Sequence, residues 1–96
     1  MVRLLTYSVY IMSNKHHTVF YVGVTSNLEV RVQEHKGGES QFTATYNVHQ
    51  LLYFEDYSDV KNAIAREKGL KKWRREWKIE LIKKENPLMK DMAADW

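Results

Sequence analysis

Two tyrosines, an arginine and a histidine follow one another over a short part of the chain: Tyr10, Tyr21, Arg31 and His35. Cleavage of a phosphodiester bond needs a base that activates water, a cation that takes up charge on the phosphate, and a group that holds the leaving group. A tyrosine has an ordinary pKa of about 10, so Tyr10 can serve as a base only if a nearby metal ion, Arg31 or His35 lowers that pKa. These residue types offer candidates for such chemistry if the fold brings them together.

A β-hairpin is expected to position the two tyrosines. Residues 7–12 and 19–24 are rich in β-branched and aromatic residues, and the polar residues between them are typical of a turn. For a loop with an even number of residues, for instance residues 14–17, antiparallel pairing sets Tyr10 opposite Tyr21. Facing residues point to the same side of a sheet, so the two phenols and the bare backbone of Gly23 are expected to share one face.

The helix that follows is expected to supply the arginine and the histidine. Residues 26–27 can cap its first turn, the predicted helix covers residues 28–36, and Gly37 ends it. Arg31 and His35 then lie one turn apart on a single side of the helix. Tyrosines, arginine and histidine can therefore converge from one compact unit.

A third strand is predicted at residues 50–55, which are apolar almost throughout, as is typical of a central strand covered on both faces. Residues 42–47 before it are expected to form a polar loop, and loops of this kind are often functional. We expect an α+β fold, with a small three-stranded antiparallel sheet flanked by helices, in a single domain over residues 1–96.

A second long helix begins after the capping residue Asp59 and carries apolar residues at helical spacing from Val60 to Trp77. Glu67 falls inside this apolar stripe. An unpaired carboxylate costs several kcal/mol to bury, so Glu67 should have a cation, a hydrogen-bond partner or a water-lined cleft nearby. The alternative is that Glu67 lies at the edge of the stripe and pairs with Lys71 one turn further on.

The C-terminal part should contain a break in the helix near residues 73–76 and a second stop before Pro87, since the residue before a proline avoids helical geometry. The tail, residues 88–96, either packs back on the sheet or frays.

Composition places the chain among ordinary globular proteins, because 44% of its 96 residues are hydrophobic and 28% charged. Cysteine is absent, which excludes disulfides and thiolate metal sites and fits a reducing cytoplasm. No apolar run reaches the roughly 18 residues that a membrane-spanning helix needs. We therefore expect a cytoplasmic protein with no membrane contact.

The order of these residues resembles the signature of the GIY-YIG nuclease superfamily, and within it the small standalone members that are similar to the N-terminal nuclease domain of UvrC. The motifs that carry the resemblance are Ser8-Val9-Tyr10, Tyr21-Val22-Gly23, Asn27-Leu28 with Arg31 and His35, residues 51–55, Arg66-Glu67-Lys68, residues 70–73, and Asn86-Pro87. Ser8 stands where the first glycine of the family's name would be. The likeness covers nearly the whole chain.

The resemblance implies catalytic roles for the first four residues. Tyr10 is expected to act as the general base, and Tyr21 to orient the water or the phosphate beside it. Arg31 would pair with the scissile phosphate through two parallel hydrogen bonds, a geometry that lysine cannot copy. His35 matches a position that carries a histidine or another polar group, and it is expected to relay the proton.

Two later residues complete the implied site. By similarity to the family, Glu67 is the single protein ligand of a divalent ion, Mg²⁺ or Mn²⁺, whose other ligands are water and a phosphate oxygen. Asn86 matches a recurrent asparagine and is expected to tie the last helix to the active face.

A net charge of +3 and a pI of about 9.2 favour a polyanionic partner, although only modestly. The cations expected to follow a nucleic-acid backbone are Lys36, Lys71, Lys72, Arg74 and Arg75. The alternative is that these cations only solubilise a helix face. The adjacent His16 and His17 fall in the hairpin turn, and we interpret them as solvent-exposed.

Three functional hypotheses follow. The first is a metal-dependent endonuclease that cuts nucleic acid, DNA in particular, one strand at a time, possible settings being DNA repair or recombination and a larger repair complex. The second is a nucleic-acid-binding module with the same fold and little or no cleavage. The third is an interaction domain with no nucleic-acid role, in which Arg31 and Glu67 form a structural salt bridge. A monomer or a weak dimer is expected.

Overall fold

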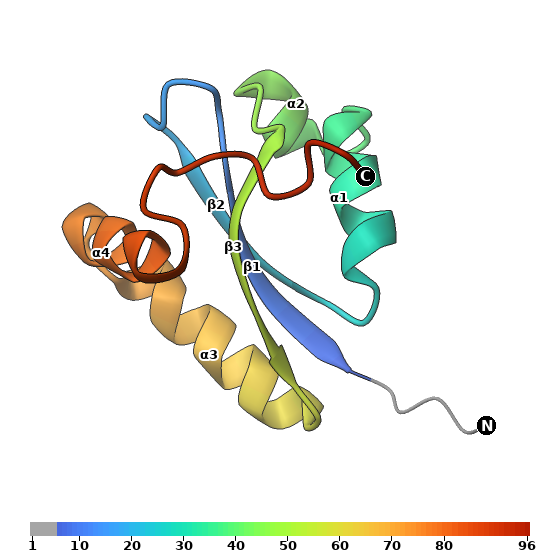
Figure 1. The fold of residues 1–96 in the computed structure, drawn as a ribbon. Helices are drawn as coiled ribbons and strands as arrows, with labels where there is room; N and C mark the ends of the chain where they lie inside the picture. The colour runs from blue at the N-terminus through green and yellow to red at the C-terminus, as the bar shows by residue number, and fades with distance from the viewer. Residues whose placement is uncertain (1–5) are drawn as a thin grey trace.

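The computed structural model describes residues 6–96 and contains one antiparallel sheet of three strands. The strands are β1 (Tyr7–Ser13), β2 (Phe20–Thr25) and β3 (Gln50–Tyr57), in the spatial order β2-β1-β3. The predicted α+β fold is confirmed. The prediction that the third strand is central is wrong, because β1 is the central strand and β3 an edge strand. The apolar character of β3 instead reflects the coverage of both faces of the sheet by helices, as expected (Figure 1).

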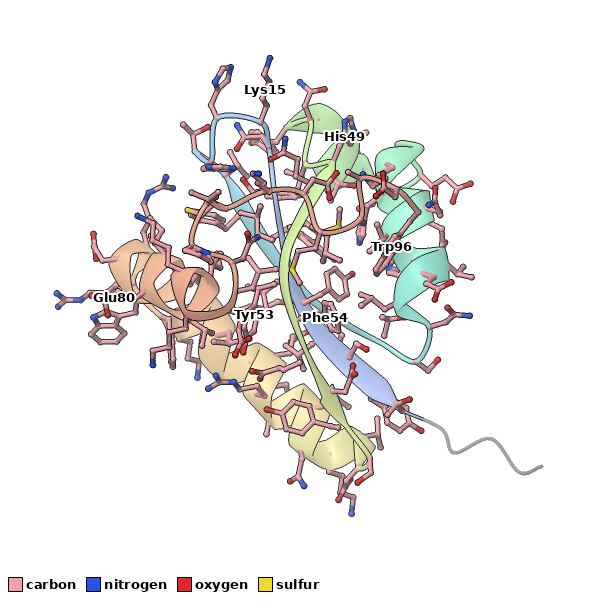
Figure 2. All side chains as sticks on the ribbon, in the orientation of Figure 1. Lys15, His49, Tyr53, Phe54, Glu80 and Trp96 are labelled. Carbon is pink, nitrogen blue, oxygen red and sulfur yellow. The ribbon has the colours of Figure 1, made fainter. Side chains whose placement is uncertain are left out.

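The helices form one layer on each side of the sheet (Figure 1). Helices α1 (Leu28–Lys36) and α2 (Gln41–Thr45) lie on one side, and α3 (Val60–Lys72) and α4 (Arg75–Glu85) on the other. Successive residues of a strand point to opposite faces, so each strand contributes to both layers. Tyr53 and Phe54, labelled in Figure 2, show this alternation on β3.

Two hydrophobic clusters result from this arrangement. The cluster under α1 consists of Tyr10, Met12, Val32, Val48, Leu51 and Ala93. The cluster under α3 and α4 consists of Val9, Ile11, Val22, Leu52, Tyr53, Ala63, Leu70 and Ile82. The sheet lies between the two clusters, so the same three strands support two different environments.

The hairpin register differs by two residues from the predicted one. Tyr10 pairs with Gly23, and Met12 with Tyr21, so the two tyrosines are diagonal neighbours rather than facing residues. The loop is longer than expected because the Asn14 side chain accepts hydrogen bonds from the backbone N–H groups of Thr18 and Val19, at 2.9 and 3.0 Å. A shift by two residues keeps each side chain on its face, so the phenols still share one side of the sheet.

Helix α1 has the predicted bounds. The Asn27 side chain accepts a hydrogen bond from the backbone of Val30 at 3.2 Å, and Gly37 ends the helix. By contrast, the region predicted as a polar loop contains α2. This segment has no glycine or proline to break it, and the Ala44 N–H bonds back to the Ser40 carbonyl at 2.9 Å.

The predicted break between the last two helices is confirmed, because the extended backbone of Trp73 and Arg74 separates α3 from α4. Helix α4 ends at Glu85, before Asn86-Pro87. The C-terminal segment then crosses from α4 towards α1 (Figure 1), and Met92 donates a backbone hydrogen bond to Leu51 on β3 at 2.7 Å. The tail therefore packs back on the sheet.

No helix within residues 6–96 combines the length and the apolar character that a bilayer span requires.

Candidate active site

Tyr10 lies in the middle of the central strand and is 1% exposed. Its ring crosses the backbone of Gly23 on the neighbouring strand. A Cβ atom added to Gly23 would lie 2.9 Å from Tyr10 Cε1 and closer still to the hydroxyl end of the ring. Any side chain at position 23 would thus displace the phenol, and glycine is required here because of this close approach.

The hydroxyl of Tyr10 starts a chain of hydrogen bonds that leads away from the sheet. Tyr10 Oη lies 2.8 Å from His35 Nε2, and His35 Nδ1 lies 3.1 Å from Thr43 Oγ1. The Thr43 hydroxyl donates to the Ser40 carbonyl at 3.1 Å. Because the only hydroxyl proton of Thr43 is used there, Thr43 accepts from His35, so Nδ1 carries the ring proton and Nε2 accepts the Tyr10 O–H.

Burial sets the protonation of this pair. Burial, assisted by the charge of Arg31, lowers the pKa of His35 to about 4, so the imidazole is neutral at pH 7. Burial also raises the pKa of Tyr10 to about 12, against the opposing hydrogen bond from Arg31. In the free protein, neither Arg31 nor His35 meets the condition stated above for Tyr10 to act as a base, because burial outweighs the effect of Arg31 on the Tyr10 pKa and His35 carries no charge.

Arg31 lies one turn before His35 on α1 and is partly exposed, with 36% of its side chain accessible. Its hydrogen bond with Tyr10 raises the pKa of the guanidinium against a smaller effect of burial, and Tyr21 adds to the rise. The nearest carboxylate is that of Glu34, at 3.7 Å. The guanidinium therefore sits beside both phenols with donors open to an incoming anion.

Tyr21 completes the cluster from β2. Its ring centroid lies 6.2 Å from that of Tyr10 and 5.1 Å from that of His35, in an edge-on arrangement. The structure thus brings together four of the predicted residues: Tyr10, Tyr21, Arg31 and His35.

Glu67 comes from α3, which packs on the opposite side of the sheet from α1 (Figure 1). It lies on α3 between Ala63 and Leu70, which pack on the opposite side, although its charge helps to raise the pKa of Tyr10 and so acts on the cluster. Its side chain is 15% exposed and pairs with Lys71 at 3.4 Å. The alternative in which Glu67 pairs with Lys71 is therefore realised.

The interaction-domain hypothesis needed a salt bridge between Arg31 and Glu67. Among the described residues, Arg31 pairs with Glu34 and Glu67 with Lys71, and no ion pair joins the two. The salt bridge that this hypothesis requires is therefore not present.

A divalent ion would find only a sparse set of protein ligands. Within residues 6–96, no group of three or more His, Cys, Asp or Glu side chains is arranged to hold a metal. Glu67 nevertheless suits Mg²⁺, because a carboxylate is a hard oxygen ligand and Mg²⁺ commonly takes one or two carboxylates and completes its shell with water and phosphate. Lys71, its partner, is 53% exposed and can swing away.

Asn86 is occupied with backbone groups. Its Nδ2 donates to the carbonyls of Leu52 at 3.1 Å and Lys90 at 2.8 Å, and its Oδ1 accepts from the Lys90 N–H at 3.1 Å. These bonds join the end of α4 and the tail to β3. In the part of the chain that the structure describes, none joins Asn86 to Tyr10 or His35, so its contacts are those of a structural tie.

The predicted backbone-binding cations fall into two groups. Lys36 pairs with Asp91 at 2.6 Å, and Arg75 donates to the carbonyls of His17 and Thr18, so both have structural partners. Lys71, Lys72 and Arg74 are exposed. In the turn, His16 is exposed as expected, whereas His17 is half-buried, with Nε2 3.3 Å from Gln50 Oε1.

Thr43 is the residue that the sequence did not reveal. It is fully buried on α2 and orients the ring of His35. No motif or periodicity marks it, because its role depends on how α2 docks beside α1.

The chain matches the model of the family described as GIY-YIG catalytic domain over residues 6–86. Because the match covers most of the chain, the protein belongs to the GIY-YIG family, a family of nucleases.

Several curated relatives are called UPF0213 proteins. That of Clostridium perfringens is 36% identical over 75 residues, which are 77% of this chain and 80% of that protein. The protein of Staphylococcus haemolyticus is 33% identical over 77% of this chain and 90% of its own length. The protein of Syntrophus aciditrophicus is 35% identical over 82% of this chain and 91% of its own length. Their name assigns no activity. No solved structure matches the chain.

Proposed function

We propose that the protein is a metal-dependent endonuclease that hydrolyses phosphodiester bonds of DNA, one strand at a time. The observation that carries this proposal is the hydrogen bond between the buried Tyr10 phenol and the unprotonated Nε2 of a neutral histidine, directly beside an arginine with free donors. A structural tyrosine needs only one partner. A tyrosine between an oriented base and an anion-binding cation has the arrangement of a catalytic group.

The proposed relay moves one proton from water to His35. Tyr10 Oη takes the proton of the attacking water while its own proton passes to His35 Nε2 over the 2.8 Å contact. Because the two transfers occur together, Tyr10 never has to exist as a free phenolate, and its pKa of about 12 does not block the step. The water oxygen attacks phosphorus, the leaving oxygen takes a proton from solvent, and His35 returns its proton to solvent.

Arg31 couples phosphate binding to this relay. In the free protein its charge helps to lower the pKa of His35. A bound phosphate would neutralise that charge through two parallel hydrogen bonds, so His35 becomes a stronger base when the substrate is in place. Tyr21 lies against the rings of Tyr10 and His35, and its proposed role is to orient the water or the phosphate.

Glu67 is the residue that would hold Mg²⁺ or Mn²⁺, after Lys71 leaves it. When bound, the ion supplies charge neutralisation at the phosphate and a lower pKa for water. Exposed Lys71, Lys72 and Arg74 then lie on the helix that carries Glu67 or at its end, where they can contact the backbone of the substrate.

Nicking of supercoiled plasmid in Mg²⁺ tests the proposal. Wild-type protein should convert supercoiled DNA to the open circle, and Glu67→Ala should lose this activity by roughly 10²-fold or more. Glu85→Ala, which removes an exposed glutamate at the end of α4, is the matched control and should cut like wild type. Equal loss of supercoiled DNA with Glu67→Ala and wild type would point to a contaminant.

The second candidate is a binding module with little cleavage. The observation that favours it is that the Glu67 carboxylate, the one proposed metal ligand, is already paired with Lys71 at 3.4 Å. Binding of DNA or RNA that survives chelation, with no cleavage of any nucleic-acid form, would decide for this candidate.

A further inference from the structure

A row of aromatic rings leads from the Tyr10 cluster to the surface. Beyond Tyr21, the ring of Phe42 follows at a centroid distance of 5.7 Å, and that of Tyr46 at 4.9 Å from Phe42. Phe42 is 43% exposed and Tyr46 48% exposed. The row therefore begins at the buried catalytic tyrosine and ends in two rings that are open to solvent.

Helix α2 holds these two rings in place. Phe42 and Tyr46 are one turn apart and so lie on the same side, while Thr43 between them points inwards to His35 at 3.1 Å. The helix lies beside α1 on the catalytic side of the sheet (Figure 1). The same short segment thus orients the His35 ring with one residue and presents two aromatic rings to solvent with its neighbours.

The exposure of Phe42 and Tyr46 beside the Tyr10 cluster needs an explanation. Burial of large apolar side chains is favourable, and these two rings are only partly buried. We propose that Phe42 and Tyr46 form a stacking site for an unpaired nucleobase next to the phosphate bound by Arg31. This inference rests on the proposed nuclease function and narrows its substrate class. Every nucleobase has a flat π-face that stacks on aromatic rings, so the site needs no particular base.

The position of the rings favours a nucleobase over a protein partner. Tyr21 is the ring that joins Phe42 to the catalytic cluster, and Tyr21 is also one of the two phenols beside the Arg31 guanidinium. A phosphate on Arg31 therefore brings its own nucleoside towards the row. In an intact duplex the base faces are covered by their neighbours, so only an unpaired or extruded base can use the site.

Fluorescence of 2-aminopurine tests the stacking directly. Oligonucleotides with one 2-aminopurine are bound in EDTA, where no cutting occurs, as single strands and as blunt duplexes. Wild-type protein should quench the single-stranded probe, and Phe42→Ala and Tyr46→Ala should remove the quenching and weaken single-strand binding roughly tenfold, with less than a twofold effect on the duplex.

Further variants separate stacking from folding. Phe42→Tyr keeps a flat ring and should restore quenching, whereas Phe42→Leu keeps an apolar contact to Tyr21 and should not. Trp96→Ala, which removes an equally exposed ring beside Glu29 and Val30 on α1 (Figure 2), should behave like wild type.

Two results would overturn the inference. One is unchanged quenching and affinity in both Phe42→Leu and Tyr46→Ala. The other is a change of oligomeric state in these variants, measured by sedimentation, with unchanged affinity for single strands, which would assign the rings to a contact between copies of the chain. Both outcomes are measured without plasmid nicking. The stacking site can therefore fail while the nuclease proposal stands, and the nuclease proposal can fail while the stacking site stands.

Discussion

The two faces of the sheet each carry tyrosines, an arginine and a polar partner, yet the two groups differ in what is left open. On the α3 side, Glu55 accepts hydrogen bonds from Tyr53 at 2.6 Å, Tyr57 at 2.7 Å and Arg66 at 2.6 Å. Burial opposes its charge, but these three donors hold the pKa of Glu55 below its ordinary value. Each charge there has its partner inside the protein.

On the α1 side, the corresponding charges are not balanced internally. Among residues 6–96, Arg31 pairs only with Glu34, at 3.7 Å, and the buried Tyr10 phenol beside it is neutral. His35 is an unprotonated base held against a hydroxyl. Residue types alone therefore do not mark a site. The closed network around Glu55 stabilises the fold, whereas the network around Arg31 lacks a closely paired anion and can bind one.

The largest effect is expected when one tyrosine on each face of the sheet is replaced by phenylalanine. Tyr10→Phe should slow plasmid nicking by about 10²–10³-fold, because general-base catalysis typically contributes this much. Tyr53→Phe removes a hydroxyl from the closed network and should leave nicking within about twofold. Each variant should lose about 1–2 kcal/mol of unfolding free energy, since each leaves one buried polar atom short of a partner. Nicking kinetics and urea titrations of the same preparations measure both effects.

Equal loss of nicking in Tyr10→Phe and Tyr53→Phe would mean that activity only follows stability. The distinction between the two faces would then have no catalytic meaning.

The next largest effect is a loss of unfolding free energy at acidic pH. The pKa of His35 in the folded protein, about 4, lies below the ordinary value of about 6.5. Between these two pH values the unfolded chain therefore binds a proton at His35 and the folded chain does not. Stability contributed by the neutral ring is present above pH 6.5 and is lost as the pH falls towards 4, at about 1.4 kcal/mol per pH unit, or roughly 3 kcal/mol in total. Urea unfolding at pH 7, 5.5 and 4.5 measures it.

His35→Gln keeps a polar group at this position and cannot titrate. Its stability should fall less steeply than that of wild type between pH 6.5 and 4. Parallel curves would show that His35 has an ordinary pKa in the folded protein.

The smallest expected effect concerns the end of the relay. Thr43→Val keeps the shape of the side chain and removes the acceptor for His35 Nδ1–H, so it should cost about 1 kcal/mol of unfolding free energy. Nicking should slow by about three- to tenfold, because the ring loses its orientation and not its base. A shifted pH–rate profile distinguishes this positioning role from simple loss of folded protein.

Local sequence patterns predicted the parts of the site that local structure determines. Helix α1 was predictable because Asn27 and Gly37 cap it, and this put Arg31 and His35 one turn apart. The common face of Tyr10 and Tyr21 was predictable from strand alternation even though the loop length, and with it the register, was misjudged.

The rest depends on contacts between segments far apart in the chain. The stripe that contains Glu67 shows that it faces a sheet, but not which face, since that depends on the path of α3 after β3. Thr43 acquires its role only when α2 docks against His35. The high pKa of Tyr10 follows from burial by several elements, which no motif records.

The position of the ring proton on His35 tests the central claim most directly, because the relay requires an unprotonated Nε2 against Tyr10. Nitrogen-15 NMR of the histidine side chains, with His35→Gln for assignment, reads both ring nitrogens. We predict that at pH 7 Nδ1 carries the proton and Nε2 does not, and that the ring stays neutral until the pH approaches about 4. A proton on Nε2, or titration near pH 6.5, would contradict the account.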